Sequence, residues 1–516
     1  MKRRDFLKMA GFGTVSLVLS RLSGAGEAGS TKGPNVLFFF VDDMRVQLGC
    51  YGKTQVKSPN IDKLAADGML FEHAYCSQAV CAPTRICTLS GLRPDETGIY
   101  DLEHPLRESG NTVVTLPQYF KNRGYETVTI GKIYHHGDDD KVSWSRMPKC
   151  EGAQYVNSVT KEFLKEKQKE GRAKGLTGTP LSRYVRGPAT ECEDVPDEAY
   201  SGGSIAETAV RQLREIKDKP FFMCVGFHKP HLPFCAPKKY WDMYKREDFT
   251  VPEKKTPEAM PQIALNDFGE MRAYTDIPKV GPVDDDGARK LIHGYHAAVS
   301  FTDAMVGKVL SELESLGLAR NTIVAIWGDH GWKLGEYGSW CKHTNFELDT
   351  HVPLIIRGPG VKAGQRCSSI VEMVDVYPTL ADLTGGTVPE HCAGSTMREL
   401  LEKGKSTLWK NMAVSQYPRG SDGQPVMGYS LRKDKWRYTE WLRKDGKIIG
   451  RELYDHSDSD LAKINVVDKP ENADLVGKLS EKLKPFIKTR WESLGGGGNK
   501  AKAQRKNKDS AAEGRR

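Results

Sequence analysis

Runs of apolar residues, each ending in polar or charged residues, recur through the first two-thirds of the chain. They occupy residues 35–41, 127–130, 221–225, 322–327 and 351–357. Continuous apolar runs of this length are typical of strands that are buried on both faces of a parallel sheet. Capped or periodic segments between them predict helices near residues 58–68, 115–124, 205–217 and 295–316. This alternation indicates an α/β fold in which helices flank a large, mostly parallel sheet.

The pattern changes in two places. Residues 136–200 are polar and irregular, so we expect loops over one face of the sheet. Beyond residue 405, alternating segments at 428–432, 436–441 and 451–455 predict a small antiparallel sheet, followed by a helix near residues 472–489. We therefore divide the body of the chain into a main domain at residues 32–405 and a C-terminal subdomain at residues 406–490.

The two ends of the chain differ from its body. Residues 1–31 combine a basic start, which includes Arg3 and Arg4, with a short apolar run that glycine and serine dilute. This arrangement resembles a bacterial twin-arginine export signal, which predicts cleavage and a periplasmic or extracellular mature protein. The mature chain contains no apolar run long enough to cross a membrane. Residues 491–516 are rich in glycine and basic residues, and we expect a disordered tail there.

The formal net charge of +9 is concentrated at the two ends. Residues 1–31 contribute +3 and residues 499–516 contribute +5, which leaves about +1 for the rest of the chain. Nucleic-acid binding needs a basic face, so no nucleic-acid partner is expected. The 11 cysteines include no Cys-x-x-Cys pair, which argues against a zinc or dithiol framework.

One segment, residues 77–91, places a cysteine near the expected start of a helix. Pro83 favours the first turn of a helix, and Gly91 is a typical stop. Cys81 would then lie where free N–H groups and the helix dipole favour an anion or a thiolate. Arg85 would project near the same end. The segment predicts a nucleophile in an anion-binding pocket, although a lone cysteine is more often an inert buried thiol.

Polar side chains also follow four of the predicted strands. In chain order they are Asp42, Asp43, Lys132, His135, His228, Asp329 and His330. In open α/β sheets the ligand site lies beyond the carboxyl ends of the strands, so these side chains are expected to meet. Each residue alone has an ordinary explanation as a turn, a cap or part of a solvated loop. Their joint position at strand ends favours a functional site.

The expected site combines carboxylates with cations. Three aspartates packed together would repel one another unless a cation lies between them. A hard divalent ion such as Ca²⁺, which takes ~6–8 oxygen ligands, resolves this conflict, and it favours an oxygen over a sulfur at position 81. Positive charge around the same point would come from Arg85, Lys132, His135, His228 and Lys342. Such a site suits an anionic substrate whose negative charge grows in the transition state.

These residues carry a resemblance to a known family. The run Cys81-Ala82-Pro83-Thr84-Arg85, together with residues 90–94, resembles the signature of the formylglycine-dependent (type I) sulfatases. Further likeness extends from about residue 33 to residue 485, and it favours the iduronate-2-sulfatase branch of that family. The resemblance implies an alkaline-phosphatase-like sulfatase fold, with a large mostly parallel sheet, flanking helices and a smaller C-terminal antiparallel sheet.

The resemblance also implies roles for single residues. Cys81 would be oxidised to formylglycine by a formylglycine-generating maturation enzyme, and the hydrated aldehyde would be the nucleophile. One Ca²⁺ would be held by Asp42, Asp43, the modified Cys81, Asp329 and His330. The remaining catalytic residues would be Arg85, Lys132, His135, His228 and Lys342. Thr84 replaces the commoner serine, Ser90 the usual threonine, and His330 the asparagine of many members.

The leading hypothesis is an exported sulfuric ester hydrolase that removes O-sulfate from a sulfated sugar or polysaccharide. A 2-O-sulfated uronate and an algal polysaccharide are both reasonable substrates. One alternative is a phosphate-ester or phosphonate hydrolase of the same superfold, although the Cys-x-Pro-x-Arg element favours sulfate. Another is a non-catalytic sulfated-glycan binder with an unmodified Cys81, against which the filled catalytic positions argue.

Overall fold

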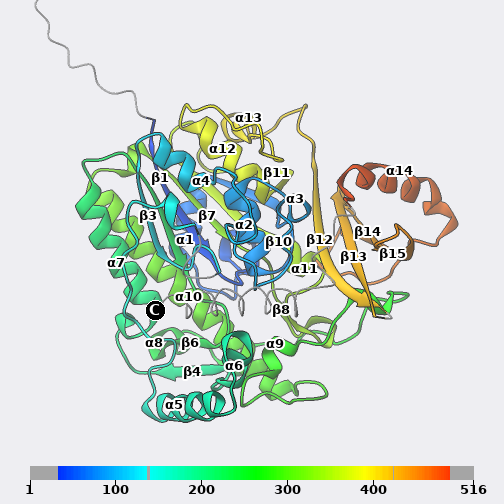
Figure 1. Cartoon of the computed structure of the whole chain (residues 1–516), viewed down its shortest axis with the longest axis horizontal. Coiled ribbons are helices and arrows are strands. Elements are labelled where there is room, and N and C mark those ends of the chain that lie inside the picture. The colour runs from blue at the N-terminus through cyan, green and yellow to red at the C-terminus, as the bar shows by residue number, and fades with distance from the viewer. Residues whose placement is uncertain (1–32, 136–139, 422, 489–516) are drawn as a thin grey trace, which may run out of the picture. The chain divides into compact units, whose positions relative to one another are not determined.

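The computed structural model describes residues 33–135, 140–421 and 423–488 of the chain (Figure 1). These residues belong to one compact unit that begins at Gly33. The predicted signal peptide at residues 1–31 and the predicted tail at residues 491–516 lie outside the described residues. Among the described residues, no helix combines the length and the apolar character that crossing a bilayer requires.

A seven-stranded sheet forms the centre of this unit, with the strand order β11-β2-β10-β7-β1-β5-β3. Its strands are β1 (Asn35–Val41), β2 (Met69–Tyr75), β3 (Glu126–Gly131), β5 (Phe221–Phe227), β7 (Thr322–Gly328), β10 (His351–Arg357) and β11 (Gln365–Glu372). Only β10 runs antiparallel to its neighbours, β2 and β7. The prediction of a large, mostly parallel sheet is therefore confirmed.

Helices cover both faces of this sheet because its central strands are apolar on both sides. In β1, Leu37, Phe39 and Val41 face one hydrophobic cluster, whereas Val36, Phe38 and Phe40 face the other. The first cluster includes side chains of α1 (Pro59–Ala66), α7 (Ser201–Ile216) and α10 (Asp285–Ser315). The second includes side chains of α2 (Cys81–Ser90), α4 (Leu116–Asn122), α12 (Val376–Leu383) and α13 (Arg398–Lys403).

The prediction that residues 136–200 form only loops is wrong. This region contains α5 (Ser158–Ala173), α6 (Gly178–Tyr184) and β4 (Thr190–Glu193), which pairs with β6 (Phe234–Pro237). Helix α5 is rich in Lys and Glu and buries little, so it lacks the apolar stripe that marks a helix in a sequence. The start of α5 is marked by an N-cap residue instead. The Asn157 side chain accepts hydrogen bonds from the N–H groups of Val159 and Thr160.

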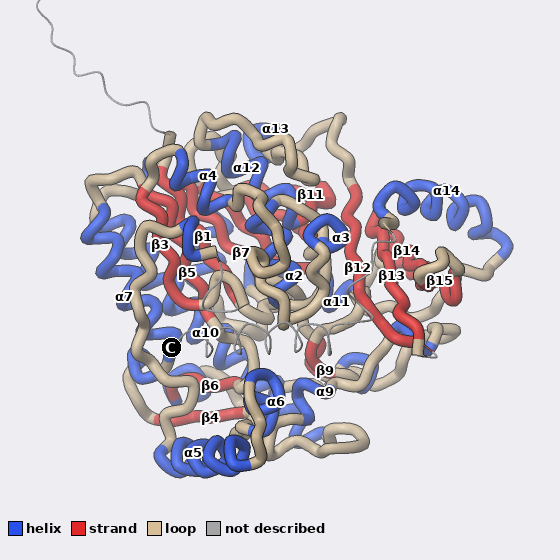
Figure 2. Tube along the Cα trace, in the orientation of Figure 1, coloured by secondary structure: helices blue, strands red, loops and turns tan. Residues whose placement is uncertain are grey.

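A separate four-stranded antiparallel sheet lies in the C-terminal part of the chain, as predicted (Figure 2). It consists of β12 (Met412–Ser421), β13 (Gln424–Lys433), β14 (Trp436–Arg443) and β15 (Ile448–Asp455), and α14 (Ala473–Leu483) follows it. The sequence pattern missed β12. The domain boundary near residue 405 stays a prediction, since the described residues form one unit.

The described chain also contains short helices and strands. They are α3 (Pro94–Thr97), α8 (Lys238–Trp241), α9 (Gly269–Arg272), α11 (Glu347–Thr350), β8 (Lys333–Leu334) and β9 (Trp340–Cys341). Helix α11 joins the two large sheets through Glu347. The carboxylate of this residue is buried and accepts hydrogen bonds from Arg437 of β14, Arg432 of β13 and Tyr75 of β2.

Candidate active site

The carboxyl ends of four neighbouring strands lie level with one another. Val41 at the end of β1 is in register with Phe227 of β5 and with Gly328 of β7, and Gly131 of β3 is in register with Gly226 of β5. The residues that directly follow these strands therefore leave the sheet at the same edge. They include Asp42, Asp43, Lys132, His228, Asp329 and His330.

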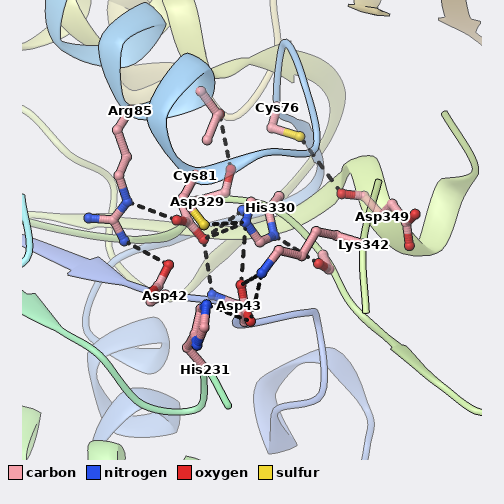
Figure 3. Close-up of polar contacts among 12 residues, drawn as sticks. Asp42, Asp43, Cys76, Cys81, Arg85, His231, Asp329, His330, Lys342 and Asp349 are labelled. Atoms are coloured by element: carbon pink, nitrogen blue, oxygen red, sulfur yellow. Dashed lines mark hydrogen bonds and ion pairs between the residues drawn. The ribbon is translucent and has the colours of Figure 1, made fainter. Parts of the chain in front are cut away.

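Asp42, Asp43 and Asp329 are buried at this edge, and each is fully shielded from solvent (Figure 3). The Asp43 N–H donates to Asp329 Oδ1 at 3.0 Å, so the two loops are tied together. Asp43 has a φ of 59°, in the left-handed region that is uncommon outside glycine. The Tyr295 hydroxyl of α10 donates to the Asp43 carbonyl at 2.9 Å and supports this conformation.

Arg85 of α2 bridges two of these carboxylates. Its Nε donates to Asp329 Oδ2 at 2.8 Å, and Nη2 donates to Asp42 Oδ1 at 3.3 Å. Nη1 donates to the carbonyl groups of Lys132 and Ile133, so one guanidinium links α2, β1, β7 and the loop after β3. A buried guanidinium with this many partners is held in place, because each hydrogen bond lost would leave a buried donor unsatisfied.

Two lysines approach the same carboxylates from other directions. Lys132 Nζ donates to Asp42 Oδ2, and Lys342, which follows β9, donates to Asp43 Oδ1 at 3.0 Å. Burial alone would raise the pKa of Asp42, but Lys132, His231 and Arg85 hold it well below its usual range. For Asp43, burial outweighs the neighbouring His231 and Lys342 and raises the pKa. The neighbouring cations thus fully offset the burial of Asp42 but only partly offset that of Asp43.

Cys81 begins α2, as the sequence predicted, and Pro83 follows within the first turn. The Cys81 side chain is only 2% exposed, and its Sγ lies 3.2 Å from His330 Nε2. Burial raises the pKa of the thiol well above its usual value, despite the opposing charge of Lys132. The helix N-terminus therefore does not make Cys81 a thiolate, and the unmodified side chain is a weak nucleophile.

The histidines of the site lie in different environments. His228 directly follows β5 and is exposed, whereas His135 is half-buried after β3. His330 is fully buried, and its Nε2 lies 3.3 Å from Asp43 Oδ1 and 3.6 Å from Asp329 Oδ1. The described contacts thus gather Asp42, Asp43, Cys81, Arg85, Lys132, Asp329, His330 and Lys342, with His228 and His135 on adjoining strand-end loops.

Sequence reasoning missed two residues of this cluster. His231 Nε2 lies 3.8 Å from Asp43 Oδ2 and 3.1 Å from Glu270 Oε1, and Glu270 of α9 also contacts Lys342. The only local signal for His231 is its position three residues after His228, which equally suits a packed loop. Glu270 has no signal at all, because its partners come from segments far away in the chain.

The donor set can be compared with the needs of a metal ion. One ligand atom from each of Asp42, Cys81, Asp329 and His330 lies within 4.8 Å of the others, and Asp43, Cys81 and His231 form a second such group. Buried carboxylates that face one another fit a hard, oxygen-preferring cation such as Ca²⁺. The Cys81 sulfur does not fit such an ion, whereas an oxygen at the same position would.

Comparisons with known proteins agree with this arrangement. A family model described as sulfatase matches residues 34–386, and one described as N-sulphoglucosamine sulphohydrolase, C-terminal, matches residues 335–489. The chain is 35% identical to iduronate 2-sulfatase of Mus musculus, with 90% of this chain and 96% of that protein covered. It is 36% identical to iduronate 2-sulfatase of Homo sapiens, with 83% and 88% covered.

A likeness to a solved structure extends over the whole fold. The structure of BT4656 in complex with its substrate, D-glucosamine-2-N,6-O-disulfate, matches with a TM-score of 0.70 at 22% identity. The match covers 90% of this chain and 99% of that chain. At this identity the match shows a shared fold.

Proposed function

This chain belongs to the sulfatase family and hydrolyses sulfate esters, and we propose that its substrate is the O-sulfate of a sulfated sugar or polysaccharide. The observation that carries the proposal is the meeting of Cys81 with three buried aspartates and Arg85 at one edge of the sheet. Cationic side chains in a largely buried setting favour an anion that gains charge during the reaction. The identity to iduronate 2-sulfatases supports a 2-O-sulfated uronate as the first substrate to test.

The proposed nucleophile is an oxygen at position 81. We propose that a formylglycine-generating enzyme oxidises Cys81, and that the hydrated aldehyde supplies a hydroxyl that attacks sulfur. Asp42, Asp43, Asp329, His330 and the oxygen at position 81 would hold Ca²⁺, which supplies positive charge beside the sulfate when it is bound. The neutral, buried thiol of Cys81 is a poor nucleophile by itself, which supports the need for this conversion.

The remaining residues have separate tasks in this proposal. Arg85 would hold the modified residue and the Asp42 and Asp329 carboxylates in place. Lys132 and His135 would orient the hydroxyls of position 81 and accept a proton from them. Lys342 and His228 would hold the sulfate group and assist the departure of the sugar alcohol.

We further propose that the protein is exported and acts in the periplasm or outside the cell. The start of the chain supports this, because residues 1–31 resemble a twin-arginine signal. An exported enzyme of this kind would meet polysaccharides rather than intracellular metabolites.

The decisive experiment uses protein produced together with a formylglycine-generating enzyme. Mass spectrometry of the Cys81 peptide should show the aldehyde in place of the thiol, and the protein should release sulfate from a 2-O-sulfated uronate disaccharide. Cys81→Ala should abolish release while the protein stays folded. Sulfate release retained by this variant would refute the mechanism. Faster turnover of an aryl phosphate or phosphonate ester than of the matched aryl sulfate would favour the phosphate-ester alternative.

A further inference from the structure

Glu270 adds a carboxylate to a site that should attract anions. It lies on the single-turn helix α9 and its side chain is 19% exposed, so it borders the site instead of facing open solvent. Its negative charge opposes the binding of a sulfate group, because like charges at close range repel even where salt screens them. Because Glu270 weakens the binding of a sulfate group, we looked for a compensating role in its contacts.

The contacts of Glu270 point to that role. Its Oε2 lies 2.9 Å from Lys342 Nζ, and its Oε1 lies 3.1 Å from His231 Nε2. Lys342 and His231 both point toward Asp43 in Figure 3, at 3.0 Å and 3.8 Å. Burial opposes ionisation of Glu270, yet Lys342 and His231 hold its pKa well below the usual range. The Glu270 carboxylate therefore bridges the Lys342 ammonium group and the His231 ring beside Asp43.

The orientation of His231 depends on the same carboxylate. Its Nδ1 lies 2.6 Å from the Leu232 carbonyl, which can only accept a hydrogen bond. The ring is thus fixed at one nitrogen by the backbone and at the other by Glu270. Without the carboxylate, Nε2 would keep only its longer approach to Asp43, at 3.8 Å.

The position of α9 itself does not depend on these contacts. Met271 and Phe268 anchor this segment in the first hydrophobic cluster, and the Thr275 N–H donates to the Gly187 carbonyl at 3.0 Å. The packing of this turn consequently does not depend on the Glu270 side chain. Removal of its charge should alter Lys342 and His231 without unfolding the helix.

We propose that Glu270 is a positioning residue that holds Lys342 and His231 where they act on the ester oxygen of the departing alcohol. The inference rests on the proposed function, since it assigns Lys342 to the sulfate ester. If Asp43 is engaged with Ca²⁺, Glu270 is the carboxylate that remains as the partner of Lys342. The pair then presents one ammonium in a fixed place, although the side chain of a free lysine has many rotamers.

The test compares two substrates that differ in their leaving group. A sugar alcohol leaves poorly and needs positive charge or a proton at its oxygen, whereas p-nitrophenolate is a good leaving group that needs neither. Glu270→Gln should therefore lower kcat for a 2-O-sulfated uronate disaccharide by about 10–100-fold. This is at or below the ~100-fold lower end of what proton-transfer assistance typically contributes, because Glu270 acts through other residues. For p-nitrophenyl sulfate the loss should be only a few-fold, and KM should change little for either substrate.

Asp267→Asn is the matched control. Asp267 lies just before α9, is exposed, and pairs with Arg272 instead of the site, so its variant should keep the wild-type rates on both substrates. A double variant adds a second check, because Glu270→Gln should cost little further in a Lys342→Gln background if it acts through Lys342. Should Glu270→Gln not fold, Glu270→Asp, one methylene shorter, should show the same bias against the sugar sulfate.

Two results would overturn the proposal. One is an equal loss on both substrates, and the other is full additivity with Lys342→Gln. Failure of the proposed function is a different result, because the wild-type protein would then release no sulfate from either substrate. A merely structural role of Glu270 would lower both rates together and would also lower the melting temperature.

Discussion

At the scale of single residues, buried carboxylates differ in how their charge is balanced. Glu347 is paired with Arg432 and Arg437, and its pKa is well below the usual range although burial opposes this. Glu452 of β15 accepts hydrogen bonds from two neutral donors, the Trp441 indole and the Tyr454 hydroxyl, each at 2.7 Å. Burial raises the pKa of Glu452 to about 7. The folded C-terminal sheet therefore prefers this side chain protonated.

This preference makes stability depend on pH. The folded pKa of Glu452 lies above the unfolded value, so its favourable contribution is complete below about pH 4.5 and is lost as pH rises toward 7. Glu452→Gln, which cannot ionise, should remove this loss. We compare the unfolding free energy of the variant with that of the wild type at two pH values. The difference, variant minus wild type, should be larger at pH 8 than at pH 5 by roughly 1–3 kcal/mol.

Urea denaturation at the two pH values measures this difference. The exposed Glu481, on α14, provides the control, since Glu481→Gln should leave the pH dependence unchanged. Parallel stability curves for the wild type and Glu452→Gln would show that Glu452 stays ionised in the fold.

The residues of the site were predictable to different degrees. Asp42, Lys132 and Asp329 directly follow apolar strands, so the rule that ligands bind at carboxyl ends was enough to group them. His231 and Glu270 could not be found in this way. They join the site through long-range packing of loops, and no local pattern of residues records such contacts.

At the scale of elements, close approach of backbones decides where the strand ends lie. A Cβ added to Gly226 of β5 would lie 2.0 Å from the Lys132 carbonyl oxygen, and one added to Gly331 would lie 1.9 Å from the Leu348 carbonyl oxygen. Both distances are far below contact. The loop that carries Lys132 thus needs Gly226 opposite it, and the loop that carries His330 needs Gly331 to pack against Leu348.

Gly226→Ala should therefore displace the loop after β3. Since Lys132 contacts Asp42 and Arg85 contacts the Lys132 carbonyl, we expect a loss of at least tenfold in kcat/KM and about 1–3 kcal/mol in stability, as for other overpacked cores. Sulfate release and thermal unfolding measure the two effects. Gly477→Ala in α14 is the control, because a Cβ there meets no atom within 4 Å and should cost nothing. Wild-type activity in Gly226→Ala would mean that the loop can shift freely.

Burial on both faces decided which strands could be predicted. Central strands buried on both faces leave long apolar runs, as in β1, whereas β2 and the edge strand β11 include half-buried or exposed positions and left no such run. The polar helix α5 packs through few side chains. Its stability comes from intrinsic propensity and an Asn157 cap, which hydrophobic periodicity does not register.

At the scale of the whole molecule, the site links all parts of the fold. It takes residues from the ends of four strands of the large sheet, from α2 and from the loop after β9. The same loop leads to α11, whose Glu347 holds the C-terminal sheet. A ligand that binds at the site should consequently stabilise the entire described unit.

Calcium should have this effect if the proposed ligands are correct. Removal of divalent ions with a chelator should lower the melting temperature, and free Ca²⁺ at 100 times its Kd should add about 2.7 kcal/mol to the unfolding free energy. Calorimetry of the intact protein measures the shift. Asp43→Asn should lose most of it, whereas the exposed control Glu258→Gln should keep it. An equal Ca²⁺-dependent increase in unfolding free energy in both variants would mean that Ca²⁺ binds at a site without Asp43.

The burial of Cys81 restricts when the proposed modification can occur relative to folding and export. With 2% of its surface exposed, the side chain is beyond the reach of any modifying enzyme once the chain has folded. If the proposed oxidation of Cys81 takes place, it should therefore act on a nascent or unfolded chain, before α2 packs against Asp329. If export proceeds through a pathway that carries folded proteins, maturation has to finish in the cytoplasm. Protein molecules that fold before Cys81 is oxidised would then be exported in a permanently inactive form.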